Sequence, residues 1–277
     1  MGDRWTLTST EAADVLTWLD VAPPEPTRAW LDALLAAYVR RVPWESASRI
    51  VRRGDASAPS DCVVPPRAFW QDARGRGLGG TCFESNAALA ALLDALGIAT
   101  TLTINDMPPS RACHTALIVV AGGVRYVVDA GLPLYAAVPL PTGDLPAMAS
   151  SAWLTYTARP TAPGRVLIEQ RPHPRPQAFE LIDGAVSPES YRNATTADYG
   201  AGGLFLDRVI VKKIVGDDIW RFASGAGVWE LERFRDGQRD TVPLPAGAEP
   251  AGRAVAAHFG MDAAVVTRAL ARVVSTG

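Results

Sequence analysis

The stretch Gly75-Arg76-Gly77-Leu78-Gly79-Gly80-Thr81-Cys82-Phe83-Glu84-Ser85-Asn86 is the part of the chain that says most about its fold. Four glycines within six residues lead directly into an apolar run that is typical of a helix and continues to Leu96. Thr81 is placed to cap this helix and Gly97 to end it. Cys82 therefore lies in the first turn, where the helix dipole favours a thiolate, although a buried structural cysteine would fit the position equally well.

The composition bounds the kind of protein that the chain can form. With 277 residues, 48% of them hydrophobic, it can bury a large core in one domain or in two to three smaller ones. The formal net charge of −2 gives no reason to expect a nucleic acid or an anionic membrane surface as partner. No apolar run approaches the roughly 20 residues of a membrane span, and the N-terminus does not resemble a signal peptide. We therefore expect a cytoplasmic protein.

The three cysteines, Cys62, Cys82 and Cys113, do not form the pattern of a disulfide framework. The sequence has no C-x-x-C pair and only three histidines, so we predict no metal site and no permanently bound cofactor. Cys62 is expected in a polar loop and Cys113 in the core. His173, between two prolines, is expected in an exposed loop.

The hydrophobic periodicity changes along the chain and predicts an α+β fold with three domains. Residues 1–97 have the helical period and form a helical domain that carries Cys82. Pro43-Trp44-Glu45 is expected to begin a short helix within it. Residues 98–200 alternate with period two, which predicts an antiparallel barrel or sandwich. Residues 201–277 mix strands with two helices and form an α/β domain.

One predicted hairpin brings two polar side chains together. Gly122-Gly123 is expected to form a two-residue turn between strands 114–121 and 124–129. In that register His114 and Asp129 are diagonal neighbours on one face, about 7–8 Å apart at the backbone. A shift of one residue would put Asp129 on the other face, so the prediction depends on the turn.

A histidine beside a carboxylate is suited to activating a thiol. The carboxylate of Asp129 would orient the His114 ring, whose other nitrogen could take the proton of Cys82. Backbone amides at Thr81–Phe83 would then stabilise negative charge at the helix N-terminus. Each residue alone also has a structural interpretation, because strand histidines are often structural and aspartates often occupy turns.

Three motifs resemble those of the arylamine N-acetyltransferases. Gly79–Asn86 is similar to the G-G-x-C-x-E-x-N signature of that family. His114–Val119 and Tyr126–Gly131 are similar to its histidine strand and its Y-x-V-D-x-G strand, and Pro43-Trp44-Glu45 resembles its P-F-E-N segment. The resemblance covers residues 10–135 well and the remainder by pattern only.

The resemblance implies a fold and a reaction. It implies a helical bundle, a central β-barrel and a smaller α/β lid around a cysteine-protease-like core. It assigns Cys82, His114 and Asp129 as a catalytic triad, with Gly80, Thr81, Phe83 and Glu84 as oxyanion or supporting residues. Cys82 would take an acyl group from a thioester of CoA or of an acyl carrier protein and pass it to a small-molecule nucleophile.

Departures from the family pattern bear on the substrate. Leu78 stands where the family has an arginine, Ser46 where it has an asparagine, and the S-P-x-S-x-F segment of the third domain is missing. These changes favour natural-product chain release or cyclisation, by a Dieckmann cyclase forming a tetramate or pyridone or by an amide synthase. The alternatives are an acetyl-CoA-dependent arylamine N-acetyltransferase, a cysteine hydrolase and a binding protein without activity.

Overall fold

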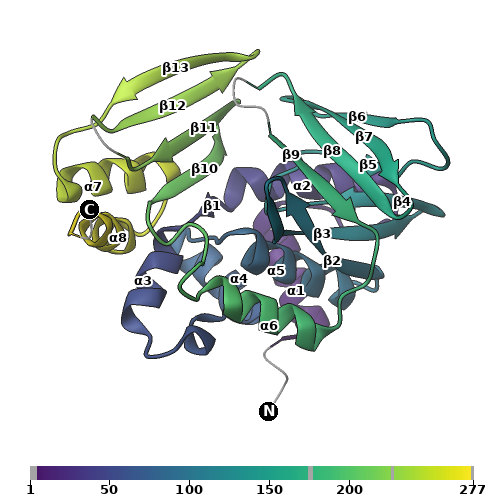
Figure 1. Cartoon of the computed structure of the whole chain (residues 1–277), viewed down its shortest axis with the longest axis horizontal. Helices are drawn as coiled ribbons and strands as arrows, with labels where there is room; N and C mark the ends of the chain where they lie inside the picture. The colour runs from purple at the N-terminus through teal and green to yellow at the C-terminus, as the bar shows by residue number, and fades with distance from the viewer. Residues whose placement is uncertain (1–4, 174–176, 226–227, 276–277) are drawn as a thin grey trace.

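The computed structural model describes residues 5–173, 177–225 and 228–275. Helices come first in the chain, followed by a strand-rich middle and a mixed C-terminal part (Figure 1). The first part contains α1 (Ser9–Leu19), α2 (Arg28–Arg41), β1 (Trp44–Glu45), α3 (Ala47–Asp55), the 3₁₀ helix η1 (Pro59–Cys62), α4 (Pro66–Arg76) and α5 (Cys82–Ala95). The middle contains β2 (Thr100–Met107), β3 (Ser110–Ala121), β4 (Val124–Val128), β5 (Val138–Pro139), β6 (Ala147–Ser150), β7 (Thr155–Ala162), β8 (Arg165–Arg171), β9 (Gln177–Ile182) and α6 (Pro188–Asp198). The last part contains β10 (Ile210–Val215), β11 (Asp218–Ala223), β12 (Glu230–Arg235), β13 (Gln238–Pro243), α7 (Ala248–Phe259) and α8 (Ala263–Ser275).

Helix α5 is the central helix of the N-terminal part. Its residues are buried from Cys82 to Leu93, because other helices and the barrel strands cover it on all sides. The Trp70 indole of α4 donates to the Ala88 carbonyl at 3.0 Å and so fixes one neighbour against it. Thr27 caps α2, and its hydroxyl accepts from the amide of Trp30.

Two expectations for the N-terminal part are wrong. Pro43-Trp44-Glu45 does not begin a helix: Trp44 and Glu45 form β1, which pairs with Lys212 and Val211 of β10. This distant strand supplies backbone partners that outweigh the local helix signal. Cys62 does not lie in a polar loop either, since it ends η1 and is fully buried.

The middle of the chain forms an eight-stranded antiparallel sheet. Its order is β5-β4-β3-β2-β9-β8-β7-β6, and the two edge strands approach each other, so the sheet curls into a nearly closed barrel. The predicted hairpin register is confirmed, with Ala121 opposite Val124 and Leu117 opposite Val128. Strands β2 and β3 are joined by a tight turn that leaves only Pro108-Pro109 between them.

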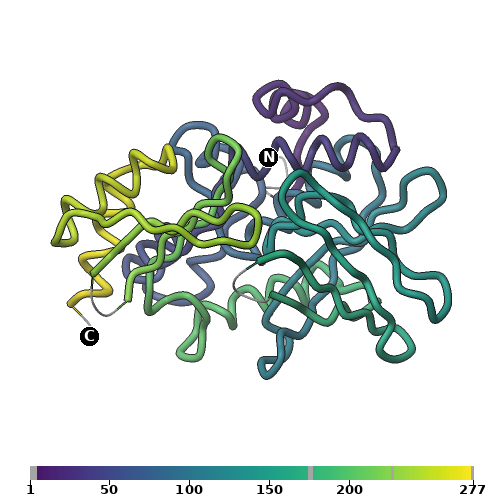
Figure 2. Tube along the Cα trace, turned by 90° about the horizontal axis from the view of Figure 1, so that it is seen from above, coloured from purple at the N-terminus to yellow at the C-terminus, as the bar shows by residue number. Residues whose placement is uncertain are grey.

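The C-terminal part forms a second sheet with the order β1-β10-β11-β12-β13. Helices α7 and α8 pack on the face that carries Val211, Phe222 and Leu231. From above, this unit lies beside the barrel (Figure 2). Gly260 ends α7 in the left-handed region, and Asp262 accepts from the first amides of α8.

The segment between barrel and C-terminal sheet differs from expectation. Helix α6, which is not evident in the hydrophobic pattern, lies where only strands are expected, and a loop follows it before β10 begins at Ile210. The α+β class with helical bundle, barrel and α/β unit is confirmed. The boundaries 1–97, 98–200 and 201–277 stay a prediction, and β1 from the first range completes the sheet of the third. None of the helices in the described part of the chain has the length and apolar character that a membrane crossing needs.

Candidate active site

Cys82 is the first residue of α5 and is 4% exposed. Thr81 is the N-cap residue as predicted. Its amide and hydroxyl both donate to the Glu84 carboxylate, at 3.0 and 2.7 Å. The Thr81 amide is therefore occupied and does not serve as the anion donor that we expected. The first turn keeps Cys82 at the positive end of the helix dipole.

His114 and Asp129 meet as the hairpin register predicts. His114 Nε2 lies 2.7 Å from Asp129 Oδ2, and both side chains are buried. The other carboxylate oxygen, Oδ1, accepts from the amides of Gly131 and Leu132 and from the Asn86 side chain. Four polar contacts thus hold the aspartate, which in turn orients the histidine ring.

Asn86 is the residue that joins helix α5 to this pair. Its Nδ2 donates to the Thr115 carbonyl at 2.6 Å and to Asp129 Oδ1 at 2.9 Å, and its Oδ1 accepts from the Ala130 amide. The Thr115 hydroxyl donates to the Cys82 carbonyl at 2.8 Å. Asn86 belongs to the G-G-x-C-x-E-x-N motif, but spacing along the chain does not reveal its part in orienting Asp129.

Gly131 allows the Asp129 loop to lie directly against Cys82. A Cβ atom at this position would come within 2.3 Å of the Cys82 Cβ and 2.8 Å of Asn86 Nδ2. No side chain larger than hydrogen fits there without moving the helix or the loop. The glycine of the Y-x-V-D-x-G motif is therefore explained by close approach of the chain.

We expect the substitution Gly131→Ala to separate the loop from the helix. Overpacking of this kind costs about 1–3 kcal/mol of the free energy of unfolding, measured by urea titration. Gly184→Ala is a matched control, because a Cβ there meets no atom within 4 Å. Equal stability of the two variants would contradict the close approach.

The surroundings of Cys82 favour the neutral form of its thiol. Burial raises its pKa, and the carboxylates of Asp198, Glu84 and Asp129 raise it further, while Arg49 lowers it. The expectation of a lowered pKa is therefore wrong, because burial outweighs the helix dipole. In the described residues no hydrogen bond joins the sulfur to His114; Sγ donates weakly to the Cys113 carbonyl at 3.7 Å.

Cys82 and His114 line a cavity of about 280 Å³ between the barrel and the C-terminal sheet. Cys113 also lines this cavity and is partly exposed to it, which corrects its placement in the core, and His173 lines it as well. Trp44 of the Pro43-Trp44-Glu45 segment lines the cavity too. The lining residues that sequence patterns do not single out are Met107, Leu132, Pro133, Gln177, Leu204, Phe205, Ile210, Lys212 and Arg221.

The other predicted supporting residues lie beneath the cavity. Gly80 accepts from the Glu45 amide at 3.1 Å, and a Cβ there would come within 2.8 Å of the Glu84 Cβ. Phe83 is buried, and its carbonyl accepts from the Tyr191 hydroxyl at 2.7 Å. The backbone links these residues to Cys82, but neither they nor Glu84 line the cavity.

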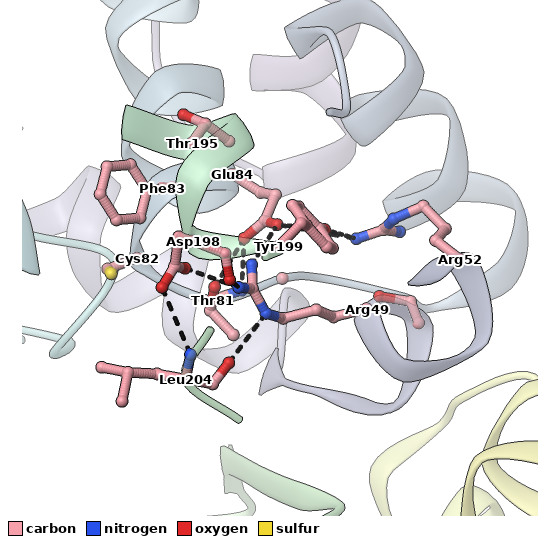
Figure 3. Close-up of polar contacts among 12 residues, drawn as sticks. Arg49, Arg52, Thr81, Cys82, Phe83, Glu84, Thr195, Asp198, Tyr199 and Leu204 are labelled. Atoms are coloured by element: carbon pink, nitrogen blue, oxygen red, sulfur yellow. Dashed lines mark hydrogen bonds and ion pairs between the residues drawn. The ribbon is translucent and has the colours of Figure 1, made fainter. Parts of the chain in front are cut away.

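Glu84 belongs to a buried ionic network beside Cys82 (Figure 3). Arg49 Nη1 donates to Glu84 Oε1 at 3.2 Å, and Nη2 donates to Asp198 Oδ2 at 2.6 Å. The Tyr199 hydroxyl donates to the same Glu84 oxygen at 2.5 Å, and its ring lies 4.0 Å from the Arg49 guanidinium. Arg49 also donates from Nε to the Leu204 carbonyl at 3.1 Å. The network connects α3 and α5 to the loop that carries Leu204 into the cavity lining.

Leu78 is buried where the resembled family has an arginine. It packs in one apolar cluster with Phe259, Met261 and Val265 of the C-terminal unit. Arg76 stays near the surface and pairs with Asp262 at 2.9 Å. The glycine loop therefore docks on α7 and α8 through apolar contact, and Leu78 does not reach the cavity.

The described residues contain no group of three or more His, Cys, Asp or Glu side chains that could hold a metal ion. Among its described residues, the site brings together the Cys82 thiol, the His114–Asp129 pair and the cations Lys212 and Arg221. A thiol beside a carboxylate-held imidazole can carry out nucleophilic chemistry.

Comparison with known proteins agrees with this arrangement. Residues 29–147 match the family model described as N-acetyltransferase. No curated protein sequence matches the chain. The arylamine N-acetyltransferase of Mycobacterium marinum, solved in complex with CoA, superimposes with a TM-score of 0.78 at 19% identity, over 95% of this chain and 98% of that one. The arylamine N-acetyltransferase of Salmonella typhimurium superimposes with a TM-score of 0.74 at 16% identity, over 96% of this chain and 99% of that one.

The fold is thus that of the arylamine N-acetyltransferases, and the resemblance seen in the sequence motifs is confirmed. Residues 29–147, which match the family model, include Cys82, His114 and Asp129.

Proposed function

We propose that the chain is a cysteine acyltransferase that forms an acyl-enzyme on Cys82. The observation that carries the proposal is the His114 Nε2–Asp129 Oδ2 contact of 2.7 Å beside a cavity that Cys82 also lines. Asp129 holds the proton on Nε2, so that Nδ1 of His114 is the nitrogen able to accept a proton.

The reaction that we propose has two steps. As the thioester enters, the Cys82 proton passes to His114 Nδ1 and the sulfur attacks the thioester carbonyl. The new thioester forms on Cys82 as the donor sulfur leaves with the proton from His114. A second nucleophile then gives its proton to His114 and takes the acyl group, and the leaving Cys82 sulfur recovers a proton from His114, which restores the thiol. The amides of Cys82 and Phe83 are the donors that we assign to the carbonyl oxygen.

The donor is an acyl thioester of CoA or of an acyl carrier protein, and no permanently bound cofactor is needed. The M. marinum relative was solved with CoA, which supports a CoA thioester. For the acceptor we propose a nucleophile on the bound chain itself, so that the product is a ring. The support is the loop after α6, where Leu204 and Phe205 line the cavity in place of the family's usual segment.

Intact-protein mass measurement after incubation with acetyl-CoA and acyl-pantetheine thioesters tests the acyl-enzyme. We expect the mass of one acyl group, lost in Cys82→Ser and kept in Cys113→Ser. Cys113 is the matched control because it lines the same cavity without a place in the proposed chemistry. Labelling that survives Cys82→Ser, or that no thioester produces, would refute the proposal.

Analysis of the small-molecule products from the same incubations separates the possible acceptors. Rapid N-acetylation of aniline with acetyl-CoA would favour the arylamine reaction, and release of free acid would favour a hydrolase. A cyclised product from a β-ketoacyl-aminoacyl thioester would favour chain release.

A further inference from the structure

The face of the C-terminal sheet that borders the cavity carries a row of polar side chains. Lys212 of β10 is directly opposite Trp44 of β1 and Arg221 of β11, and Arg221 is opposite Glu232 of β12. Directly opposed residues on antiparallel strands share one face of the sheet. Trp44, Lys212 and Arg221 accordingly line the same cavity as Cys82.

Lys212 is a buried cation that no carboxylate of the described residues pairs with. It is 7% exposed, and its Nζ donates to Gln177 Oε1 at 3.3 Å and lies 5.8 Å from the centre of the Tyr135 ring. Across residues 5–173, 177–225 and 228–275, no acidic side chain forms an ion pair with it. The neighbouring cation Arg221, in contrast, is paired with Glu232.

Burying an ammonium group without a counter-ion costs free energy of folding, so a lysine in this environment needs an explanation. Burial and the adjacent Arg221 lower the pKa of Lys212 to about 8, while Asp129 acts in the opposite direction. The side chain still carries its proton at neutral pH, and an anion bound nearby would stabilise that charged form. The cavity therefore holds a positive charge that a ligand can neutralise.

The rest of the lining limits where such an anion can lie. Met107, Leu204, Phe205 and Ile210 give the cavity apolar walls. A short acyl chain attached to Cys82 would contact these walls and bring its far end toward the sheet that carries Lys212.

We propose that Lys212 determines specificity by binding an anionic oxygen on the acyl chain delivered to Cys82. The inference rests on the proposed acyl transfer and names its substrate class: acyl donors that carry a carboxylate or an ionisable 1,3-dicarbonyl group. Gln177, held by Gln170 at 2.5 Å, keeps the ammonium in place.

Competing acyl-pantetheine thioesters test this specificity. Succinyl-pantetheine supplies a carboxylate, acetoacetyl-pantetheine a 1,3-dicarbonyl and butyryl-pantetheine a neutral chain of similar length. We expect at least one anionic donor to acylate Cys82 about tenfold faster than butyryl-pantetheine, and Lys212→Met to abolish that ratio. The donor that shows the effect identifies the source of the anionic oxygen.

Lys213→Met is the matched control. Lys213 is the next residue of β10, lies on the opposite face and donates to the Phe259 carbonyl at 2.7 Å. Burial lowers its pKa to about 8 as well. We expect the ratio of anionic to neutral donors to be unchanged in this variant. A ratio near one in the wild type, or an equal ratio in Lys212→Met, would overturn the inference while leaving the acyl-enzyme intact.

A binding measurement makes the test independent of turnover. Succinyl-pantetheine in which NH replaces the thioester sulfur cannot transfer its acyl group, and calorimetry gives its Kd. We expect binding to weaken about tenfold in Lys212→Met and to stay unchanged in Lys213→Met. Equal affinity of the wild type and Lys212→Met would refute the role of Lys212, whether or not Cys82 is acylated.

Discussion

Asp129→Asn is expected to slow the acylation of Cys82 by about 10³-fold or more while the protein stays folded. The Oδ1 oxygen would still accept from Asn86, Gly131 and Leu132, so the loop keeps its contacts. The amide nitrogen, however, would replace the oxygen that faces His114 Nε2. That nitrogen donates a hydrogen bond, so Nε2 must accept it and the ring proton moves to Nδ1. The nitrogen that should take the thiol proton is then already protonated.

Single-turnover mass measurement of the acyl-enzyme gives the rate constant for this comparison. Asp183→Asn is the matched control, because Asp183 forms only an exposed pair with Arg125 far from the cavity. We expect the control to react at the wild-type rate and both variants to unfold near the wild-type temperature. A loss of less than tenfold in Asp129→Asn would show that the carboxylate does not set the histidine tautomer.

Arg49→Met is expected to lower the free energy of unfolding by about 3–5 kcal/mol at neutral pH, because it leaves buried carboxylates without their main partner. The Arg49 side chain is fully buried, as is that of Glu84 to within 1%. Burial raises the pKa of Glu84, but Arg49, Arg52, Tyr199 and Thr81 outweigh it and hold the pKa at about 2 instead of its ordinary 4.5. Such a shift corresponds to about 3 kcal/mol of stability.

The pH dependence distinguishes this charge effect from lost packing. The folded-state pKa of Glu84 lies below the unfolded value, so its contribution is fully present above about pH 4.5. It is lost as the pH falls from about 4.5 to about 2. The deficit of Arg49→Met relative to the wild type should therefore shrink across that window in urea titrations. A deficit that stays constant with pH would assign the effect to packing alone.

Arg52→Met provides the matched comparison on the same helix. Arg52 lies 3.9 Å from Glu84 Oε1 and is partly exposed, so its removal should cost less than that of Arg49. Arg49→Met should also loosen the loop that Arg49 holds through Asp198 and Leu204, which a faster digestion by protease near residue 204 would reveal.

The site could be predicted from sequence wherever its geometry is local. The helix that begins at Cys82 follows from the glycine loop and the apolar run after it. The contact between His114 and Asp129 follows from a two-residue turn, because period-two alternation and one register decide which side chains share a face. Both depend on residues within about twenty positions of each other, where spacing alone is informative.

Other features depend on partners that are far apart in the chain. Trp44 and Glu45 form a strand because β10, more than 160 residues away, provides its hydrogen bonds. The cavity lining combines residues of both sheets and of the loop after α6, so neither Lys212 nor Phe205 has a local signal. The thiol pKa likewise depends on burial and on carboxylates from three separate segments, and this tertiary environment outweighs the helix dipole.

The sequence by itself therefore determined the helix that carries Cys82, the hairpin that joins His114 to Asp129 and the resemblance to a family of acyltransferases. Only the tertiary structure decided what surrounds them: burial and carboxylates that raise the pKa of the thiol, a buried arginine on Glu84 and a buried lysine in the cavity. The physical reason is that hydrophobic periodicity predicts whether a segment is a helix or a strand and which of its side chains share a face. Burial and charge at a site are instead set by whichever distant segments pack around it.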